Sequence, residues 1–178
     1  RTGKFRWDIG FNLTKTQTEI TALRKQEDPN FTGIPVSGIQ GGTGNNIGLH
    51  AVGGWPYAFY AFQQVYTSEG KPLEGVYADR NQIFQKPAAN LLFGVNTGIQ
   101  YDKFTLSISG HGMSGNYLYN NFQSERSVMR NLTNPVGAIN NATTLLLEQG
   151  FQNNQYLSDL YIENASFFRL DQIHLGYY

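Results

Sequence analysis

The fold is decided by the stretch FGVNTGIQYDKFTLSISG, which runs from Phe93 to Gly110. Apolar residues alternate with small or polar ones along it, apart from two turn residues, Asp102 and Lys103. Because successive side chains of a β-strand point to opposite faces, this period of two predicts two strands joined by a minimal hairpin. One face would carry Leu91, Phe93, Val95, Thr97, Ile99, Tyr101, Phe104, Leu106, Ile108 and Gly110, and the other Leu92, Gly94, Asn96, Gly98, Gln100, Thr105, Ser107, Ser109 and His111. The alternation alone leaves open whether the apolar face contacts a protein core or lipid.

Two further strands follow from the ends of the sequence. KFRWDIGFNLTKT, residues 4–16, alternates without error and predicts a strand over about 4–23. SFFRLDQIHLGYY, residues 166–178, predicts a strand over 167–178 in which the apolar positions change parity after Leu170. The change indicates a β-bulge near Asp171–Gln172 or, alternatively, a strand with two apolar faces. Arg169 and Asp171 share a parity with Phe167, and we expect a salt bridge between them.

Composition favours an all-β protein. Of the 178 residues, 15% are charged and 14% aromatic, and glycine is frequent, whereas periodic runs of helix-forming residues are nearly absent. Only Asn141–Gln149 is a candidate for a short helix. The net charge is zero and the basic residues are dispersed, which argues against a nucleic-acid surface. No cysteine is present, so a disulfide framework and cysteine-based zinc sites are excluded.

The lengths of the connections favour lipid as the environment of the apolar face. The turn at Asp102–Lys103 is short, whereas the long segments of about 24–89 and 114–165 would lie at the opposite ends of the strands. Outer-membrane barrels have short periplasmic turns and long extracellular loops, whereas a sandwich has loops at both ends. Because the smallest such barrels have about eight strands, four strands indicate a piece of a larger barrel or assembly.

The residues then resemble those of a family. KFRWDIGFNLTKTQTEITAL, VGGWPYAFYAFQQVYTSEGKPLEG, KPAANLLFGVNTGIQYDKFTLSISGHGMSGNYLYNN and NASFFRLDQIHLGYY occur in the order found in SusC-like (RagA/SusC) TonB-dependent outer-membrane receptors. The most specific pieces are Tyr101–Phe104 with Leu106 and Ser107, and Ser166–Leu170 with Leu175–Tyr177. The resemblance implies the C-terminal part of a large, roughly 22-stranded transmembrane antiparallel β-barrel, with the plug domain absent from this chain.

By this resemblance the chain would belong to a transporter of the Gram-negative outer membrane. It would import glycan or peptide fragments, driven by a TonB complex through the absent plug region. A SusD-like surface lipoprotein would close the extracellular side, and the two long segments would meet it. The resemblance implies no enzymatic activity and no cofactor.

The parity of the strands assigns side chains to the two environments. We expect lipid contacts for Phe5, Trp7, Ile9, Phe11, Val95, Ile99, Leu106 and Ile108. The lumen would receive Arg6, Asp8, Asn12, Asn96, Gln100, Ser107 and His111. In the loops, possible ligand or lid contacts are Trp55, Tyr57, Tyr60, Tyr117 and Tyr119. The alternative for the first three is packing against a neighbouring loop or a partner protein. The histidines His50, His111 and His174 lack the spacing of metal ligands, so no metal site is expected.

Two other classes of protein stay open at this point. One is a small autonomous outer-membrane barrel acting as an adhesin or pore, which needs about four more membrane strands within 24–89 and 114–165. The other is a soluble carbohydrate-binding β-sandwich, which requires Trp7 and Phe11 to be buried in protein.

Overall fold

A computed structural model of the chain describes residues 3–24, 28–82, 85–133 and 136–178. The chain divides into two compact units, each built from separate stretches of sequence. Unit 1 comprises residues 1–17, 88–117 and 164–178, and unit 2 comprises residues 18–87 and 118–163.

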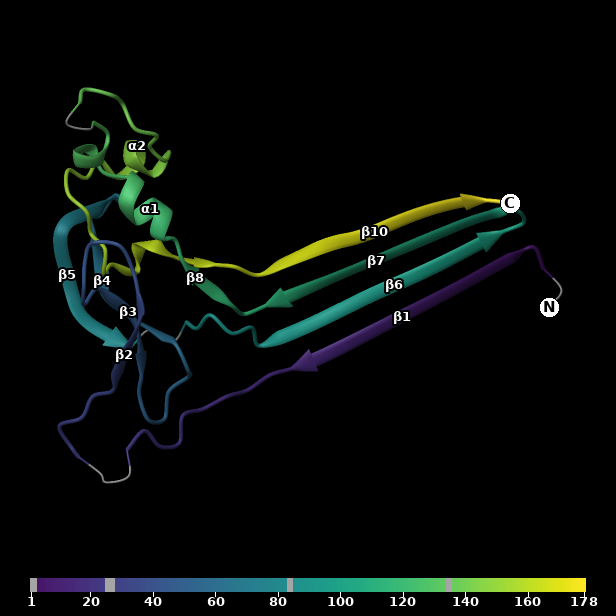
Figure 1. The fold of residues 1–178 in the computed structure, drawn as a ribbon, viewed down its shortest axis with the longest axis horizontal. Helices are drawn as coiled ribbons and strands as arrows, with labels where there is room; N and C mark the ends of the chain where they lie inside the picture. The colour runs from purple at the N-terminus through teal and green to yellow at the C-terminus, as the bar shows by residue number, and fades with distance from the viewer. Residues whose placement is uncertain (1–2, 25–27, 83–84, 134–135) are drawn as a thin grey trace. The chain divides into compact units, whose positions relative to one another are not determined.

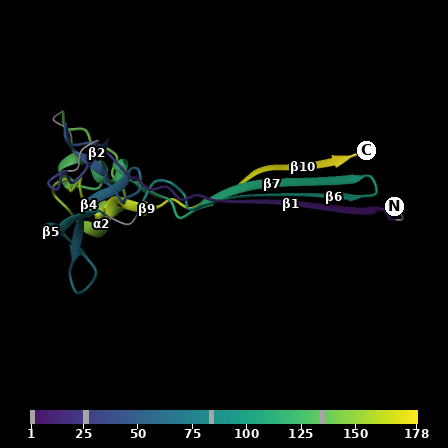
Figure 2. The ribbon, with the colours of Figure 1, turned by 90° about the horizontal axis from the view of Figure 1, so that it is seen from below.

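Unit 1 is a four-stranded antiparallel sheet in a single layer (Figures 1 and 2). Its strands are β1 (Phe5–Lys15), β6 (Leu91–Tyr101), β7 (Phe104–Ser114) and β10 (Phe167–Tyr177), in the order β1-β6-β7-β10. β6 and β7 form the hairpin predicted from the sequence, closed by the pair Tyr101–Phe104. The turn needs a residue in the left-handed region, and Asp102 occupies it with φ +51°.

The first strand is shorter than the expected range of 4–23. It ends at Lys15, which pairs with Leu91, the first residue of β6. One further bond joins the amide of Thr16 to the carbonyl of Asn90. Beyond that point β6 offers no partner, so residues 16–24 are not a strand although three threonines and Ile20 among them favour strands.

The predicted β-bulge in β10 is confirmed. Gly110 of β7 pairs with Leu170 and the next residue, Ser109, pairs with Gln172, so that Asp171 is the extra residue. An extra residue reverses the parity of all that follows. Phe168 and Leu170 before the bulge therefore share a face with Ile173, Leu175 and Tyr177 after it, and the alternative of two apolar faces is wrong.

Unit 2 is folded, whereas the sequence suggested long loops over 24–89 and 114–165. It contains a sheet of β2 (Ile34–Gly38), β3 (Asn46–His50), β4 (Ala58–Tyr66) and β5 (Pro72–Gln82), in that order. Its helical elements are α1 (Asn121–Arg126), η1 (Met129–Asn131), α2 (Leu145–Gln149) and η2 (Asp159–Tyr161). The short strands β8 (Tyr117–Tyr119) and β9 (Ile162–Asn164) pair with each other in a separate two-stranded sheet.

The hydrophobic core of the chain lies in unit 2. Its buried apolar side chains are Ile47, Leu49, Ala58, Phe59, Ala61, Val128, Leu146, Phe151 and Tyr161. A buried amide, Gln64, holds β4 to its neighbours where the β4–β5 pairing is irregular. Its Nε2 donates to the carbonyl of Leu73 (2.6 Å), and its Oε1 accepts from Ser158 Oγ (3.0 Å). Within the described chain, no helix has both the length and the apolar character needed to cross a membrane.

Candidate functional site

One face of the four-stranded sheet, here the apolar face, carries large hydrophobic side chains on every strand and is not covered. Trp7 is 60% exposed and Phe11 69% exposed, and the apolar residues of β10 are similarly open. No segment of unit 1 is stacked on this face (Figure 2). A soluble domain does not expose to water a contiguous apolar surface that extends over four strands. The exposure of Trp7 and Phe11 contradicts the requirement of the soluble sandwich.

An aromatic row crosses the apolar face at the end of the sheet that holds the β6–β7 turn. Phe5 pairs with Tyr101, Tyr101 with Phe104, and Phe104 with Tyr177, so that every strand contributes one ring. The rings of Phe104 and Tyr177 are in contact, with centroids 5.0 Å apart. Aromatic residues in this position are typical of the membrane–water interface of outer-membrane barrels.

On the apolar face, the polar atoms of Trp7 and Thr97 form hydrogen bonds within the sheet. Trp7 Nε1 donates to Thr97 Oγ1 (2.8 Å), and the same hydroxyl donates to the main-chain carbonyl of Asp8 (3.1 Å). Lipid supplies no hydrogen-bond partner, so an indole N–H facing lipid needs one from the protein. The Thr97 hydroxyl provides it, which suits an apolar environment better than water.

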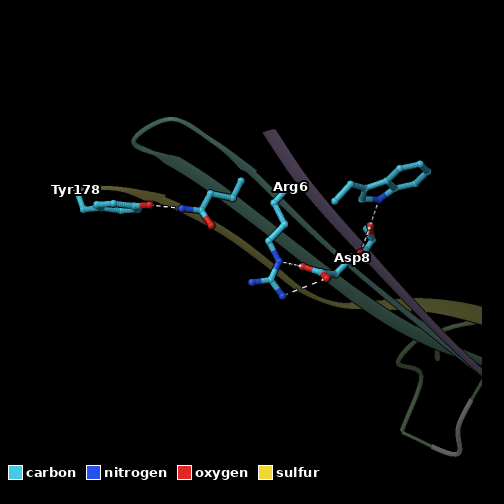
Figure 3. Close-up of polar contacts among 6 residues, drawn as sticks. Arg6, Asp8 and Tyr178 are labelled. Carbon is cyan, nitrogen blue, oxygen red and sulfur yellow. Dashed lines mark hydrogen bonds and ion pairs between the residues drawn. The ribbon is translucent and has the colours of Figure 1, made fainter. Parts of the chain in front are cut away.

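The opposite, polar face brings the seven predicted lumen residues together. Arg6, Asp8, Asn12, Asn96, Gln100, Ser107 and His111 share this face, by the register of β1, β6 and β7. Arg6 and Asp8, two positions apart on β1, form an ion pair with Nε 2.7 Å and Nη2 3.2 Å from the carboxylate (Figure 3). Gln100 donates to the hydroxyl of Tyr178, which is not among the predicted lumen residues.

A hollow of about 550 Å³ lies at the start of β1, beside the β6–β7 turn. Lys4, Arg6, Gln100 and Asp102 supply its polar groups. Lys4 Nζ lies 3.8 Å from the Asp102 carboxylate, and both groups are largely exposed. This pair therefore contributes little to stability.

The bulge of β10 gives Asp171 a partner other than the expected one. Asp171 Oδ2 lies 2.6 Å from His111 Nδ1, whereas the Arg169 guanidinium lies over the ring of Phe167. The predicted Arg169–Asp171 salt bridge is wrong. The prediction assumed an unbroken strand, and the extra residue turns Asp171 towards β7 instead.

The aromatic side chains of the β3–β4 region belong to unit 2 and are partly covered by cations. Lys86 Nζ lies 5.0 Å from the ring centre of Trp55, and the guanidinium of Arg80 lies 4.5 Å from that of Tyr60. Tyr57 is 53% exposed and has φ +60°, which is rare for a bulky residue. Its ring meets His50 edge-on, with centroids 4.6 Å apart. Of these aromatic residues, Tyr57 offers the most surface to a ligand or partner.

The two tyrosines of β8 differ in their availability. Tyr117 is half-buried, and Tyr119 donates its hydroxyl to the main-chain carbonyl of Tyr156 (2.5 Å). Tyr156 donates in turn to the carboxylate of Glu125 (2.5 Å). Burial, together with the Glu125 carboxylate, raises the pKa of Tyr156 to about 12, so both hydroxyls stay protonated and serve the structure. Among the described residues, no group of three or more His, Cys, Asp or Glu is placed to hold a metal ion.

Comparison with known proteins finds a receptor that is similar to this chain, although no family model matches it. Over 99% of its length the chain is 33% identical to the TonB-dependent receptor SusC of Bacteroides thetaiotaomicron. The chain is similar to SusC along almost its whole length. It spans 19% of the length of that receptor.

Solved structures agree on the fold of this SusC-like chain. It superposes on a structure of the RagAB peptide transporter with a TM-score of 0.72, 17% sequence identity, and coverage of 98% of this chain and 20% of the other. The closed-closed and open-open states of the RagAB peptide importer give TM-scores of 0.66 and 0.61, with 15% and 16% identity. Each covers 99% of this chain, and 21% and 20% of the respective other chain. The SusC-like chain thus has the all-β, antiparallel fold of a transmembrane β-barrel segment.

Proposed function

We propose that the chain forms part of the barrel wall of a TonB-dependent outer-membrane transporter that imports nutrients into a Gram-negative bacterium. The apolar face carries this proposal: four antiparallel strands present it uncovered, and an aromatic row bounds it at one end. The apolar face would contact lipid and the polar face would line the lumen. The exposure of this face on all four strands, added to the alternation, favours a barrel wall over a protein core.

The edges of the sheet support a position within a larger barrel. β1 and β10 are the outer strands, and each pairs on one side within the described chain. Unpaired main-chain N–H and C=O groups are not tolerated in lipid. In the membrane, each edge of the sheet therefore needs a further strand to pair with. We place the chain in the C-terminal part of the barrel, with a plug region elsewhere in the transporter.

The same proposal assigns the partners and the solute. A TonB complex would act on the plug, a SusD-like lipoprotein would cover the extracellular side, and unit 2 would meet it there. The solute would be an oligosaccharide or an oligopeptide, in keeping with the similarity to SusC and the shared fold with a peptide transporter. Transport of this kind requires conformational gating and no covalent step by these residues. Tyr57 is the proposed contact in unit 2 because it is exposed on a constrained backbone.

Spin labels along β1 test the orientation of the sheet. In the full-length receptor in lipid, single cysteines at Ile9 and Phe11 should give labels that collide with dissolved oxygen. Cysteines at Asp8 and Asn12 should give labels that collide with a water-soluble nickel chelate. The period of two in β1 predicts this alternation, because lipid concentrates oxygen and excludes the chelate.

Equal chelate accessibility at all four positions would rule out a barrel wall. Import is tested separately by deleting the full gene and measuring uptake of oligosaccharides and oligopeptides. If the deletion strain takes up all of them as the parent does, the proposed transport function is wrong even when the labels alternate.

The small autonomous barrel is less well supported. Its additional crossings would have to come from unit 2, where β2 and β3 have five residues each and belong to a separate sheet. A membrane strand needs about 9–11 residues.

A further inference from the structure

The glycines of the polar face are covered by side chains of neighbouring strands, with one exception. A Cβ at Gly10 would lie 2.5 Å from Asn96 Oδ1, one at Gly94 would lie 2.7 Å from Asn12 Oδ1, and one at Gly176 would lie 2.5 Å from Thr105 Oγ1. At Gly98 a Cβ would meet nothing within 4 Å. On the polar face, the main chain at Gly98 is therefore not covered by a side chain of a neighbouring strand.

This opening is the floor of a hollow of about 300 Å³, the Gly98 hollow, with Asp8, Asn96, Gly98, Ser107, Ser109 and Gln172 in its lining. The register explains why these residues meet. Asp8, Gly98 and Ser107 lie opposite one another on three strands, and Asn96, Ser109 and Gln172 form the next line across the sheet. The volume lies at the lower end of the range for small-molecule sites.

The polar side chains on the rim of the Gly98 hollow are uncharged, and their hydrogen-bonding groups are available to a ligand. The side chains of Asn96, Ser107, Ser109 and Gln172 make no hydrogen bond with any residue that the structure describes, and hydroxyls and amides can both donate and accept. The one charged lining residue, Asp8, is neutralised by Arg6. A charged ligand would find no free counter-charge here, whereas a neutral hydrogen-bonding ligand would find four partners.

We propose that the Gly98 hollow is a binding subsite for an uncharged, hydroxyl-rich solute, a saccharide unit, on the lumen wall. A pyranose ring has an apolar C–H face and a rim of hydroxyls. The rim of hydroxyls and amides complements the sugar hydroxyls, and the space above Gly98, where no side chain lies, gives room for the ring. This inference rests on the proposed transport function and names the class of solute and the residues that hold it.

Thiol protection tests the subsite directly. Gly98→Cys is introduced into the full-length receptor, which is kept with its partner proteins in the outer membrane, and modified with a small neutral methanethiosulfonate. Gly98 has no positive φ and open space around it, so the substitution fits the fold. Neutral hexasaccharides of glucose, mannose, xylose and fructose are the probes, and an uncharged Gly-Ser hexapeptide is the competing class. At least one hexasaccharide should slow modification at position 98 and leave modification of Thr14→Cys, on the same face outside the hollow, unchanged.

Truncation of the rim gives a second measurement that adds no bulk. Ser107→Ala with Ser109→Ala should raise the hexasaccharide concentration needed for protection about tenfold, because two hydrogen bonds to the solute are lost. Thr14→Ala, which removes a hydroxyl from the same face, should leave this concentration unchanged.

Several results would overturn the subsite: no protection by any hexasaccharide, protection by the hexapeptide alone, equal protection at Thr14, or no effect of the two serine substitutions. If the parent receptor imports a sugar while position 98 stays unprotected, only the subsite is wrong. Loss of the lipid–water alternation along β1 would instead contradict the transporter itself.

Discussion

At the scale of single residues, the contact between Trp7 and Thr97 distinguishes a lipid-facing sheet from one in water. The indole N–H has one acceptor, the Thr97 hydroxyl at 2.8 Å. Thr97→Val removes that acceptor and should lower the free energy of unfolding of the receptor in lipid by about 1–3 kcal/mol, because lipid offers the indole N–H no other acceptor. Trp7→Phe is the control: in that background Thr97→Val should lower the free energy of unfolding by clearly less. Equal costs in the two backgrounds would show that the hydrogen bond has no role.

Glu74 gives a prediction of pH dependence in unit 2. Partial burial tends to raise the pKa of Glu74, but hydrogen bonds from the main-chain N–H groups of Gln152 (3.0 Å) and Asn153 (2.8 Å) and from the Asn153 side chain outweigh it and lower the pKa. A lowered pKa stabilises the fold above the ordinary value of 4.5 and the stabilisation disappears as the pH falls through the folded-state pKa.

Hydrogen exchange checks this directly. After correction for intrinsic rates, the amides of Gln152 and Asn153 should lose protection below pH 4.5 in the parent. In Glu74→Gln their protection should be weaker at neutral pH and nearly independent of pH. Unchanged protection of both amides in the parent on acidification would refute this account of Glu74.

At the scale of elements, the bulge in β10 keeps one apolar face continuous through a change of parity. Deleting Asp171 should restore the simple register and turn Ile173, Leu175 and Tyr177 to the polar face. We expect the amount of folded, heat-modifiable receptor in the outer membrane to fall severely. Asp171→Ala keeps the extra residue and loses only the contact with His111, so its folded amount should stay near that of the parent. Similar losses in both variants would mean that the carboxylate, and not the register, matters.

The elements also show how far the sequence predicts this fold. All four strands of unit 1 carry apolar residues on one face and small or polar residues on the other, so their period of two is nearly free of errors. The end of β1 was overestimated because it depends on where β6 begins, a long-range fact. Unit 2 was missed because β4 has irregular pairing and buries Gln64 beside apolar residues, which removes the alternation. Gly98 carried no signal, since its role depends on which neighbours leave it uncovered.

At the scale of the whole molecule, the two units differ in the environment that they need. Among the residues that the structure describes, the buried apolar side chains of the core belong to unit 2, whereas the sheet of unit 1 exposes its apolar side chains. Residues 18–163 with the segment 88–117 replaced by a flexible linker should therefore fold in water without detergent, seen as a monomer with dispersed amide NMR signals. A peptide of the four strands should need detergent or lipid. Aggregation of the excised unit 2 under all conditions would show that it depends on the sheet for folding.

The aromatic row has a consequence for depth in the membrane. Its four rings lie along the hydrogen-bonding direction, at right angles to the strands. With strands about 4.8 Å apart and tilted by about 40° in the barrel, that line rises by about 3 Å per strand, or about 9 Å from β1 to β10. In the proposed orientation, Phe5 and Tyr177 would therefore contact different layers of the lipid, one nearer the headgroups and one nearer the acyl chains. In a series of lipids that carry bromine at different carbons of the acyl chain, the bromine that contacts Phe5 should be at a different carbon from the one that contacts Tyr177.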